Sequence, residues 1–208
     1  MKINYADKTN FNANLIAKSG NFKICKLSDK GDFKFLKDFC DRVDFKELMP
    51  NLSKAETDRW HEMLEYAIIC AKDPQNTTYI EILNDKLCGI ITCFQNQTTI
   101  VDCICTIPIN IGEKVKLAGK TLFYQIFKDF AEYGGKRMKL NAIINGPYNT
   151  INKYKDLGFK ETTNTTKTYV EMDANQYSVK EAFKGLQKLI PYKKVTNEKV
   201  NLEEYITN

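Results

Sequence analysis

The residues best suited to chemistry lie where a strand-like run leads into a basic loop and then a helix, between Asp102 and Phe130. The loop and helix start carry Lys114, Lys116 and Lys120. Unpaired N–H groups and the positive end of the helix dipole would add to these lysines and form an anion site that suits a pyrophosphate. From spacing alone, an ordinary loop with solvated lysines is the alternative. The GxxxxGK[ST] nucleotide-binding pattern is absent.

A second polar set follows one face of an expected helix and comprises Asp58, His61, Glu62 and Glu65. Such a row either attracts a cationic amine or is a solvated surface. His61 is the single histidine, and the seven cysteines form no CxxC pair. The usual zinc-ligand spacing is therefore missing, and we expect reduced core cysteines and no metal.

These candidates need a scaffold, which hydrophobic periodicity and turn residues outline. The expected strands are residues 21–28, 77–83, 87–94, 98–109, 136–144, 159–163 and 165–173, and the expected helices are 31–43, 53–71, 119–133, 148–157 and 178–190. Capping boxes at Ser53 to Glu56 and Ser178 to Glu181 are predicted to open two helices. Residues 1–20 show no clear period, and the last seventeen residues are polar.

This order predicts an α/β (α+β) fold with a mixed, mainly antiparallel central sheet flanked by helices. Strands 77–109 form a meander, and the helix at 119–133 makes the next strand parallel to its predecessor. We expect an N-terminal polar segment at 1–20, a core domain at 21–173 and a C-terminal helical appendage at 174–208. That appendage could cap a cleft, pack on the sheet or form a dimer contact.

The order of elements and two motifs resemble the GNAT superfamily of acyl-coenzyme A N-acyltransferases over about 150 residues. The YKDLGF run from Tyr154 to Phe159 matches the family's Tyr-x-x-x-Gly-Phe ending. The family's loop of Gln or Arg, two residues, Gly, one residue, and Gly or Ala corresponds to Lys114, Val115, Lys116, Leu117, Ala118 and Gly119, with Lys120 entering the helix. Two positions depart from it, because Lys114 replaces Gln or Arg and Leu117 replaces the first glycine.

The resemblance implies direct transfer of an acetyl group from acetyl-coenzyme A to a primary amine, on a small molecule or a protein. It implies Tyr154 as the acid for the departing thiolate and Asp102 as the base. Asp102 is one residue out of place, so it faces the site only with a β-bulge or a shifted alignment, and a solvated surface aspartate is the alternative. Glu81 and Glu171 are the fallback carboxylates.

The resemblance also assigns groups that would hold the cofactor. The main-chain amides of Ile107 and Ile109 would pair with its acyl and pantetheine groups, and one would polarise the thioester carbonyl. Asn145 and Asn149 lie near the position of the family's asparagine. Pro108 would help to splay the strand from its parallel neighbour.

Composition limits the other possibilities. The formal net charge is +5, and no stretch approaches the roughly 20 apolar residues of a membrane span. We therefore expect a cytoplasmic protein without a membrane partner, and a homodimer stays open. The competing functions are a non-catalytic acyl-coenzyme A sensor with the same fold and, last, a nucleic-acid-associated domain using Lys136, Arg137 and Lys139.

Overall fold

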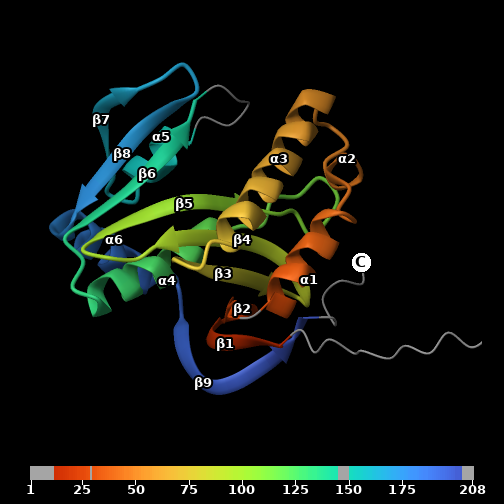
Figure 1. The fold of residues 1–208 in the computed structure, drawn as a ribbon, viewed down its shortest axis with the longest axis horizontal. Coiled ribbons are helices and arrows are strands. Elements are labelled where there is room, and N and C mark those ends of the chain that lie inside the picture. The colour runs from red at the N-terminus through yellow and green to blue at the C-terminus, as the bar shows by residue number, and fades with distance from the viewer. Residues whose placement is uncertain (1–11, 29, 145–149, 203–208) are drawn as a thin grey trace, which may run out of the picture.

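A central sheet organises the computed structural model, which describes residues 12–28, 30–144 and 150–202 (Figure 1). The strands are β1 (Asn12–Ser19), β2 (Phe22–Lys26), β3 (Asn76–Leu83), β4 (Lys86–Phe94), β5 (Thr98–Thr106), β6 (Arg137–Ile143), β7 (Lys160–Thr165), β8 (Tyr169–Asn175) and β9 (Tyr192–Asn201). The helices are α1 (Lys30–Cys40), α2 (Phe45–Leu48), α3 (Lys54–Ala71), α4 (Ala118–Glu132), α5 (Ile151–Lys155) and α6 (Gln176–Leu189).

The strands lie in the order β7-β8-β6-β5-β4-β3-β2-β1-β9. Every neighbouring pair is antiparallel except β5 and β6, which are parallel. The predicted meander of β3, β4 and β5 is confirmed, as is the parallel strand after the crossover helix α4. The sheet is therefore mixed and mainly antiparallel, as the sequence predicts.

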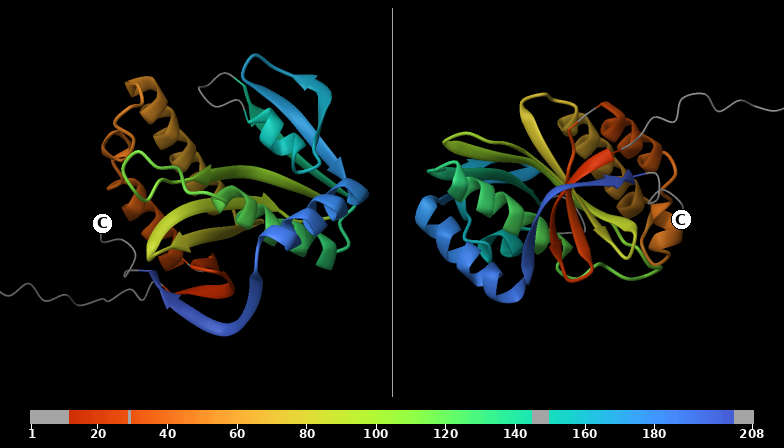
Figure 2. Two further views of the ribbon diagram at one scale, coloured as in Figure 1. Left: turned by 180° about the vertical axis from the view of Figure 1, so that it is seen from behind. Right: turned by 90° about the horizontal axis from the view of Figure 1, so that it is seen from below.

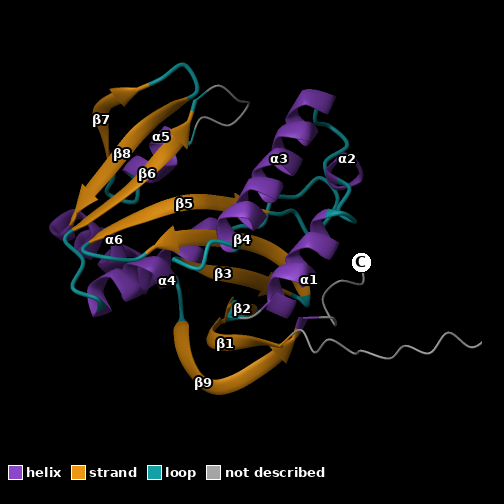
Figure 3. Ribbon diagram, in the orientation of Figure 1, coloured by secondary structure: helices purple, strands orange, loops and turns teal. Residues whose placement is uncertain are grey.

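Helices cover both faces of the sheet, α1 to α3 on one and α4 to α6 on the other (Figures 2 and 3). The stripe predicted on α3 faces the first core, where Leu64 and Ala67 are fully buried. The predicted apolar face of α4 is also buried, with Phe123 and Phe127 in the second core. The capping box at Ser53 forms, because its hydroxyl accepts from the Glu56 amide while the Glu56 carboxylate accepts from the Ser53 amide.

The ends of the described chain differ from the sequence prediction. Strand β1 lies within the segment expected to lack a period, and β9 lies within the expected polar tail. The two pair antiparallel from Asn12↔Asn201 to Ser19↔Tyr192, so both belong to the sheet. The predicted capping box at Ser178 is wrong, because Asn175 caps α6 by accepting from the amides of Tyr177 and Ser178.

A buried polar network fixes α4 against the sheet. The Asp129 carboxylate accepts hydrogen bonds from the Tyr79 hydroxyl on β3, from Gln95 Nε2 at 3.1 Å and from Gln125 Nε2 at 2.7 Å. Tyr192, at the start of β9, donates to the Gln125 side chain. Burial raises the pKa of Asp129 above the usual aspartate range, and these donors oppose that rise by stabilising the carboxylate.

Helix α4 begins in a conformation that usually requires glycine. Leu117, its N-cap, has φ 71° and ψ −10°, and its side chain is 43% exposed. A Cβ in this left-handed region clashes with the backbone and costs about 1–2 kcal/mol. The leucine that replaces the expected glycine therefore keeps the glycine's backbone geometry.

We predict that Leu117→Gly has a larger free energy of unfolding than Leu117→Ala by about 1 kcal/mol, because glycine removes the left-handed strain while alanine retains the Cβ. Urea unfolding of the two variants measures this difference. Both lose the same exposed side chain, so alanine is the matched control. Equal stability of the two variants would show that position 117 is not strained.

Candidate active site

The sheet opens at the one parallel strand pair found among the described residues. β5 and β6 are paired from Thr98↔Arg137 to Val101↔Leu140, after which β5 continues to Thr106 and β6 to Ile143 without further pairing between them. A cavity of about 440 Å³ lies at this opening. Its described lining comes from α3, β5, β6, α5, β8 and the loop before α4. Pro108 does not start the splay, because the strands separate well before it.

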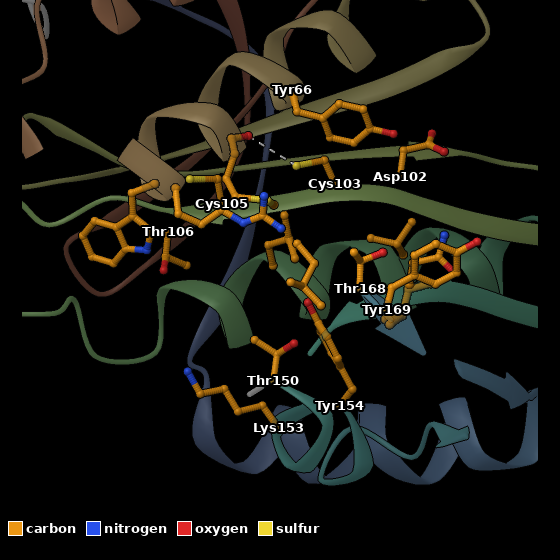
Figure 4. Close-up of a pocket in the computed structure, with 18 of the residues that line it drawn as sticks. Tyr66, Asp102, Cys103, Cys105, Thr106, Thr150, Lys153, Tyr154, Thr168 and Tyr169 are labelled. Atoms are coloured by element: carbon orange, nitrogen blue, oxygen red, sulfur yellow. Dashed lines mark hydrogen bonds between the residues drawn. The ribbon is translucent and has the colours of Figure 1, made fainter. Parts of the chain in front are cut away.

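Asp102 lies at the irregularity that the sequence prediction requires. The register of β4 and β5 shifts between Thr92↔Cys103 and Cys93↔Val101, which leaves Asp102 as the extra residue of a β-bulge. Its partly buried side chain lines the cavity, and Figure 4 shows the Tyr66 ring directed toward it. Burial raises the pKa of Asp102, a hydrogen bond with Asn76 opposes the rise and the Asp73 charge adds to it.

The main-chain groups that face the opening are not the ones expected. The Ile107 amide donates to the Cys88 carbonyl of β4 at 2.8 Å, so it is not available to a ligand. Because alternate residues of an antiparallel strand direct their amides to opposite edges, Ile104 and Thr106 present theirs toward β6. Ile104 and Thr106 also line the cavity. The predicted role of the Ile107 amide is thus wrong, because β4 already accepts its hydrogen bond.

Ile107 and Ile109 instead border a second cavity of about 540 Å³, on the side of α1 and α2. The Ile109 carbonyl there accepts from Lys86 Nζ at 3.3 Å. Pro108 lines the same space. The structure therefore separates this expected pair from Asp102 and Tyr154.

The start of α4 lies next to Ile104 and Thr106, two residues that line the first cavity. The first intrahelical hydrogen bond of α4 runs from the Thr121 amide to the Leu117 carbonyl at 2.8 Å, so the amides of Ala118, Gly119 and Lys120 precede the helical ladder. A Cβ built on Gly119 would lie 3.7 Å from Thr106 Cγ2 and 3.9 Å from Ile104 Cδ1, which is ordinary contact. The protein itself therefore has room for a side chain at this position.

Two lysines stand near this helix start. Lys114 lines the cavity, and Lys153 of α5 lines it as well. Burial and then the Lys153 charge lower the pKa of Lys114, while Glu56 opposes the change. Lys116 and Lys120 are exposed, and Val115 packs against a small apolar cluster with Cys88.

Tyr154 extends from α5 into the same cavity (Figure 4). Its ring makes edge contacts with Phe123 and Phe159, at centroid distances of 6.0 and 6.2 Å. Burial raises the pKa of Tyr154 to about 12, and a hydrogen bond with Thr150 opposes the rise. The phenol is therefore protonated throughout the neutral range. Asn145 and Asn149 lie outside the described residues.

The fallback carboxylates do not reach the cavity lining. Glu81 is fully buried on β3, where its carboxylate lies against Gly89, and burial raises its pKa well above the usual range. Glu171 accepts from Lys139 Nζ at 3.2 Å on β6. Neither one lines the cavity described above.

The other charged sets are engaged elsewhere. On α3, Glu62 pairs with Arg59 at 3.0 Å and His61 lies 3.6 Å from Glu65. Arg59 lines the cavity, whereas the predicted polar set of Asp58, His61, Glu62 and Glu65 does not. Arg137 pairs with Asp173, and Lys139 pairs with Glu171, so opposite charges accompany two members of the basic cluster.

Sequence reasoning missed several cavity residues because they form no motif. Lys153 and Thr150 belong to α5, Tyr66 to α3 and Tyr169 to β8. Lys153 lies one position before Tyr154 and could have been noticed beside the YKDLGF run. Tyr66 and Tyr169 are brought together only by the fold.

Two further observations concern ligands and membranes. Among the described residues, no group of three or more His, Cys, Asp or Glu side chains is arranged to hold a metal ion. No helix in the described ranges has the length and apolar character needed to span a membrane.

The sequence matches no protein-family model and no curated protein. Its structure is similar to the PaiA N-acetyltransferase of Thermoplasma acidophilum in complex with coenzyme A, with TM-score 0.51, 19% identity and coverage of 74% of this chain and 98% of the other. Apo FdhC, a nucleotide-linked sugar GNAT, matches with a TM-score of 0.56 and 11% sequence identity, and the match covers 85% of this chain and 97% of the other. A SpeG spermidine N-acetyltransferase chimera from Vibrio cholerae and hSSAT matches with a TM-score of 0.50 and 15% sequence identity. That match covers 78% of this chain and 99% of the other.

These matches extend over most of both chains. At such low identity they establish the architecture and not the acceptor. The protein has the fold of the GNAT acetyltransferases.

Proposed function

We propose that the protein is an N-acetyltransferase that moves an acetyl group from acetyl-coenzyme A to a primary amine. The observation that carries the proposal is the cavity at the end of the β5–β6 pairing, whose lining residues Ile104 and Thr106 lie next to the open first turn of α4. Acetyltransferases of the same fold, one of them bound to coenzyme A, support it.

The residues present fit coenzyme A. The amides of Ala118, Gly119 and Lys120 and the positive end of the α4 dipole suit a pyrophosphate, and Lys114 and Lys153 add positive charge. The edge amides of Ile104 and Thr106 suit the amide-rich pantetheine arm, because that arm can continue the hydrogen bonding that β6 no longer provides. The Cβ-sized space beside Gly119 allows close approach of a ligand to the backbone.

Acetyl-coenzyme A supplies an activated thioester. Asp102 would accept the proton that the amine loses, since its raised pKa makes it a better base than an exposed aspartate. Tyr154 would donate its phenolic proton to the departing thiolate. An amide on the β6-facing edge of β5 would stabilise the negative charge that develops on the carbonyl oxygen.

The first experiment is calorimetric titration with acetyl-coenzyme A, followed by measurement of free-thiol release across a panel of amines. The proposal expects binding and amine-dependent release. Binding without release from any amine would favour the non-catalytic sensor, and no binding would overturn the function altogether.

We predict that Gly119→Ala weakens coenzyme A binding at least about tenfold, because the new methyl group enters the space where the phosphates approach the α4 backbone. The same variant should be more stable by about 0.5–1 kcal/mol, since alanine favours helix. Calorimetry measures the affinity and urea unfolding the stability.

Gly185→Ala in α6 is the matched control, because a Cβ there meets no atom within 4 Å. It should gain similar stability and leave coenzyme A affinity unchanged. If the two alanine variants bind coenzyme A equally well, the first turn of α4 is not the phosphate site.

We predict that Tyr154→Phe lowers kcat by about 100-fold, the usual contribution of a general acid, while coenzyme A affinity changes little. The phenylalanine ring preserves the contacts with Phe123 and Phe159. Steady-state thiol release and calorimetry on the same preparation separate the two effects. An unchanged kcat would remove Tyr154 from the mechanism.

A further inference from the structure

The cavity between β5 and β6 differs in charge from one end to the other. Lys153 and Asp102 lie at opposite ends of the cavity in Figure 4. Lys114 belongs with the cationic end, because the charge of Lys153 acts on it. Asp102 is the one carboxylate among the described residues that line the cavity. The end away from the lysines therefore offers a single anionic group.

Aromatic and apolar side chains surround that group. Tyr66 lies beside Asp102, and Tyr169 lies across the cavity from them (Figure 4). Trp60 of α3 also lines the space, and an edge contact with Phe45 at a centroid distance of 5.3 Å orients its ring. Tyr66 is 50% exposed, although a large apolar ring usually finds cover. Aromatic faces next to a carboxylate suit a cation attached to an apolar body.

We propose that the acceptor is a primary amine with a single cationic centre on an aromatic or other apolar body. This inference rests on the proposed acetyltransferase function and names the acceptor class for the same site. The ammonium group pairs with Asp102, and the apolar body lies against Tyr66 and Tyr169.

A polyamine or a basic peptide fits this lining less well. A second ammonium group would find no further carboxylate among the described lining residues. The acidic residues of α3 do not compensate, because Glu62 pairs with Arg59 and Glu65 lies beside His61. An uncompensated second charge therefore costs desolvation free energy and gains little.

The transfer balances in atoms and charge with Asp102, Tyr154 and solvent as the proton carriers. The ammonium group loses one proton and attacks the carbonyl carbon of the thioester, so that a C–N bond forms and the C–S bond breaks. Tyr154 gives its proton to the thiolate and regains one from the nitrogen by way of Asp102 and solvent. The products are an N-acetyl amide, free coenzyme A thiol and one released proton.

The test compares three acceptors in thiol-release assays, namely 2-phenylethylamine, spermidine and a lysine-containing peptide. We expect kcat/KM for 2-phenylethylamine to exceed the other two at least about tenfold. Calorimetry of 2-phenylethylamine against the protein saturated with coenzyme A gives a readout that does not depend on turnover. Asp102→Asn should weaken that binding about tenfold or more, since the charge pair is lost.

Three variants serve as controls. Glu65→Gln removes a carboxylate of α3, the helix that carries Tyr66. Glu65 does not line the cavity, so this variant should change amine binding by less than about twofold. Tyr66→Phe keeps the ring and should keep the preference for 2-phenylethylamine over butylamine, whereas Tyr66→Ala should lose it. Unchanged coenzyme A affinity shows that each variant is folded.

The possible results distinguish a wrong acceptor class from a wrong acetyltransferase function. Faster acetylation of spermidine or of the peptide would overturn the acceptor class and leave the transferase intact. Binding of 2-phenylethylamine without thiol release would support the acceptor site and overturn the transfer. If 2-phenylethylamine neither reacts nor binds while acetyl-coenzyme A does bind, the acceptor class is wrong, and failure of acetyl-coenzyme A to bind would overturn both.

Discussion

The architecture depends on the end of the parallel pairing between β5 and β6. Beyond Val101 and Leu140 the two strands diverge, so the sheet divides there into two arms, one that ends with β5 and one that begins with β6. β5 keeps its pairing with β4, and β6 keeps its pairing with β8. The open edge of β5 is thereby left with main-chain donors that a strand would otherwise satisfy, which creates a binding site from secondary structure alone.

Helix α4 keeps the two arms in place. It packs in the core that also contains residues of β6 and β8, and Asp129 ties it to β3 and to the turn after β4. A buried carboxylate that accepts several hydrogen bonds tolerates little displacement, because each lost bond leaves a desolvated charge. The first turn of the same helix lies next to Ile104 and Thr106 of β5, so the network at one end stabilises the position of the proposed anion site at the other.

Much of this fold was predictable from local patterns, but the site was predictable only in part. The α3 stripe, the α4 stripe and the meander follow from periodicity, and all are confirmed. β9 contains few apolar residues, so its own sequence gives no strand pattern. Its pairing with β1 and an ion pair from Lys18 to Glu198 hold it in the sheet. β1 alternates Ala13, Leu15 and Ala17 inward, a signal weakened by the small alanines.

The site residues show the same division. Tyr154 and Gly119 were identified from motifs, and the structure brings them to one cavity region. Ile107 was assigned in place of Thr106 because spacing does not reveal which edge of a strand an amide faces, and this is decided by pairing with β4. The aromatic lining comes from elements far apart in sequence, whose proximity only the tertiary fold determines. The division into residues 1–20, 21–173 and 174–208 remains a prediction, although both end segments contribute strands to the sheet.

The pairing of β1 with β9 has a consequence for biosynthesis. Lys18 and Glu198, joined across these strands, are 180 positions apart. While the chain emerges from the ribosome, β1 waits for nearly all of the described sequence before its outer partner exists. The β1–β2 hairpin is therefore an unprotected sheet edge during translation, open to pairing with neighbouring nascent chains. The lysines of β1 and β2, Lys18, Lys23 and Lys26, add charge that discourages such contacts in that interval.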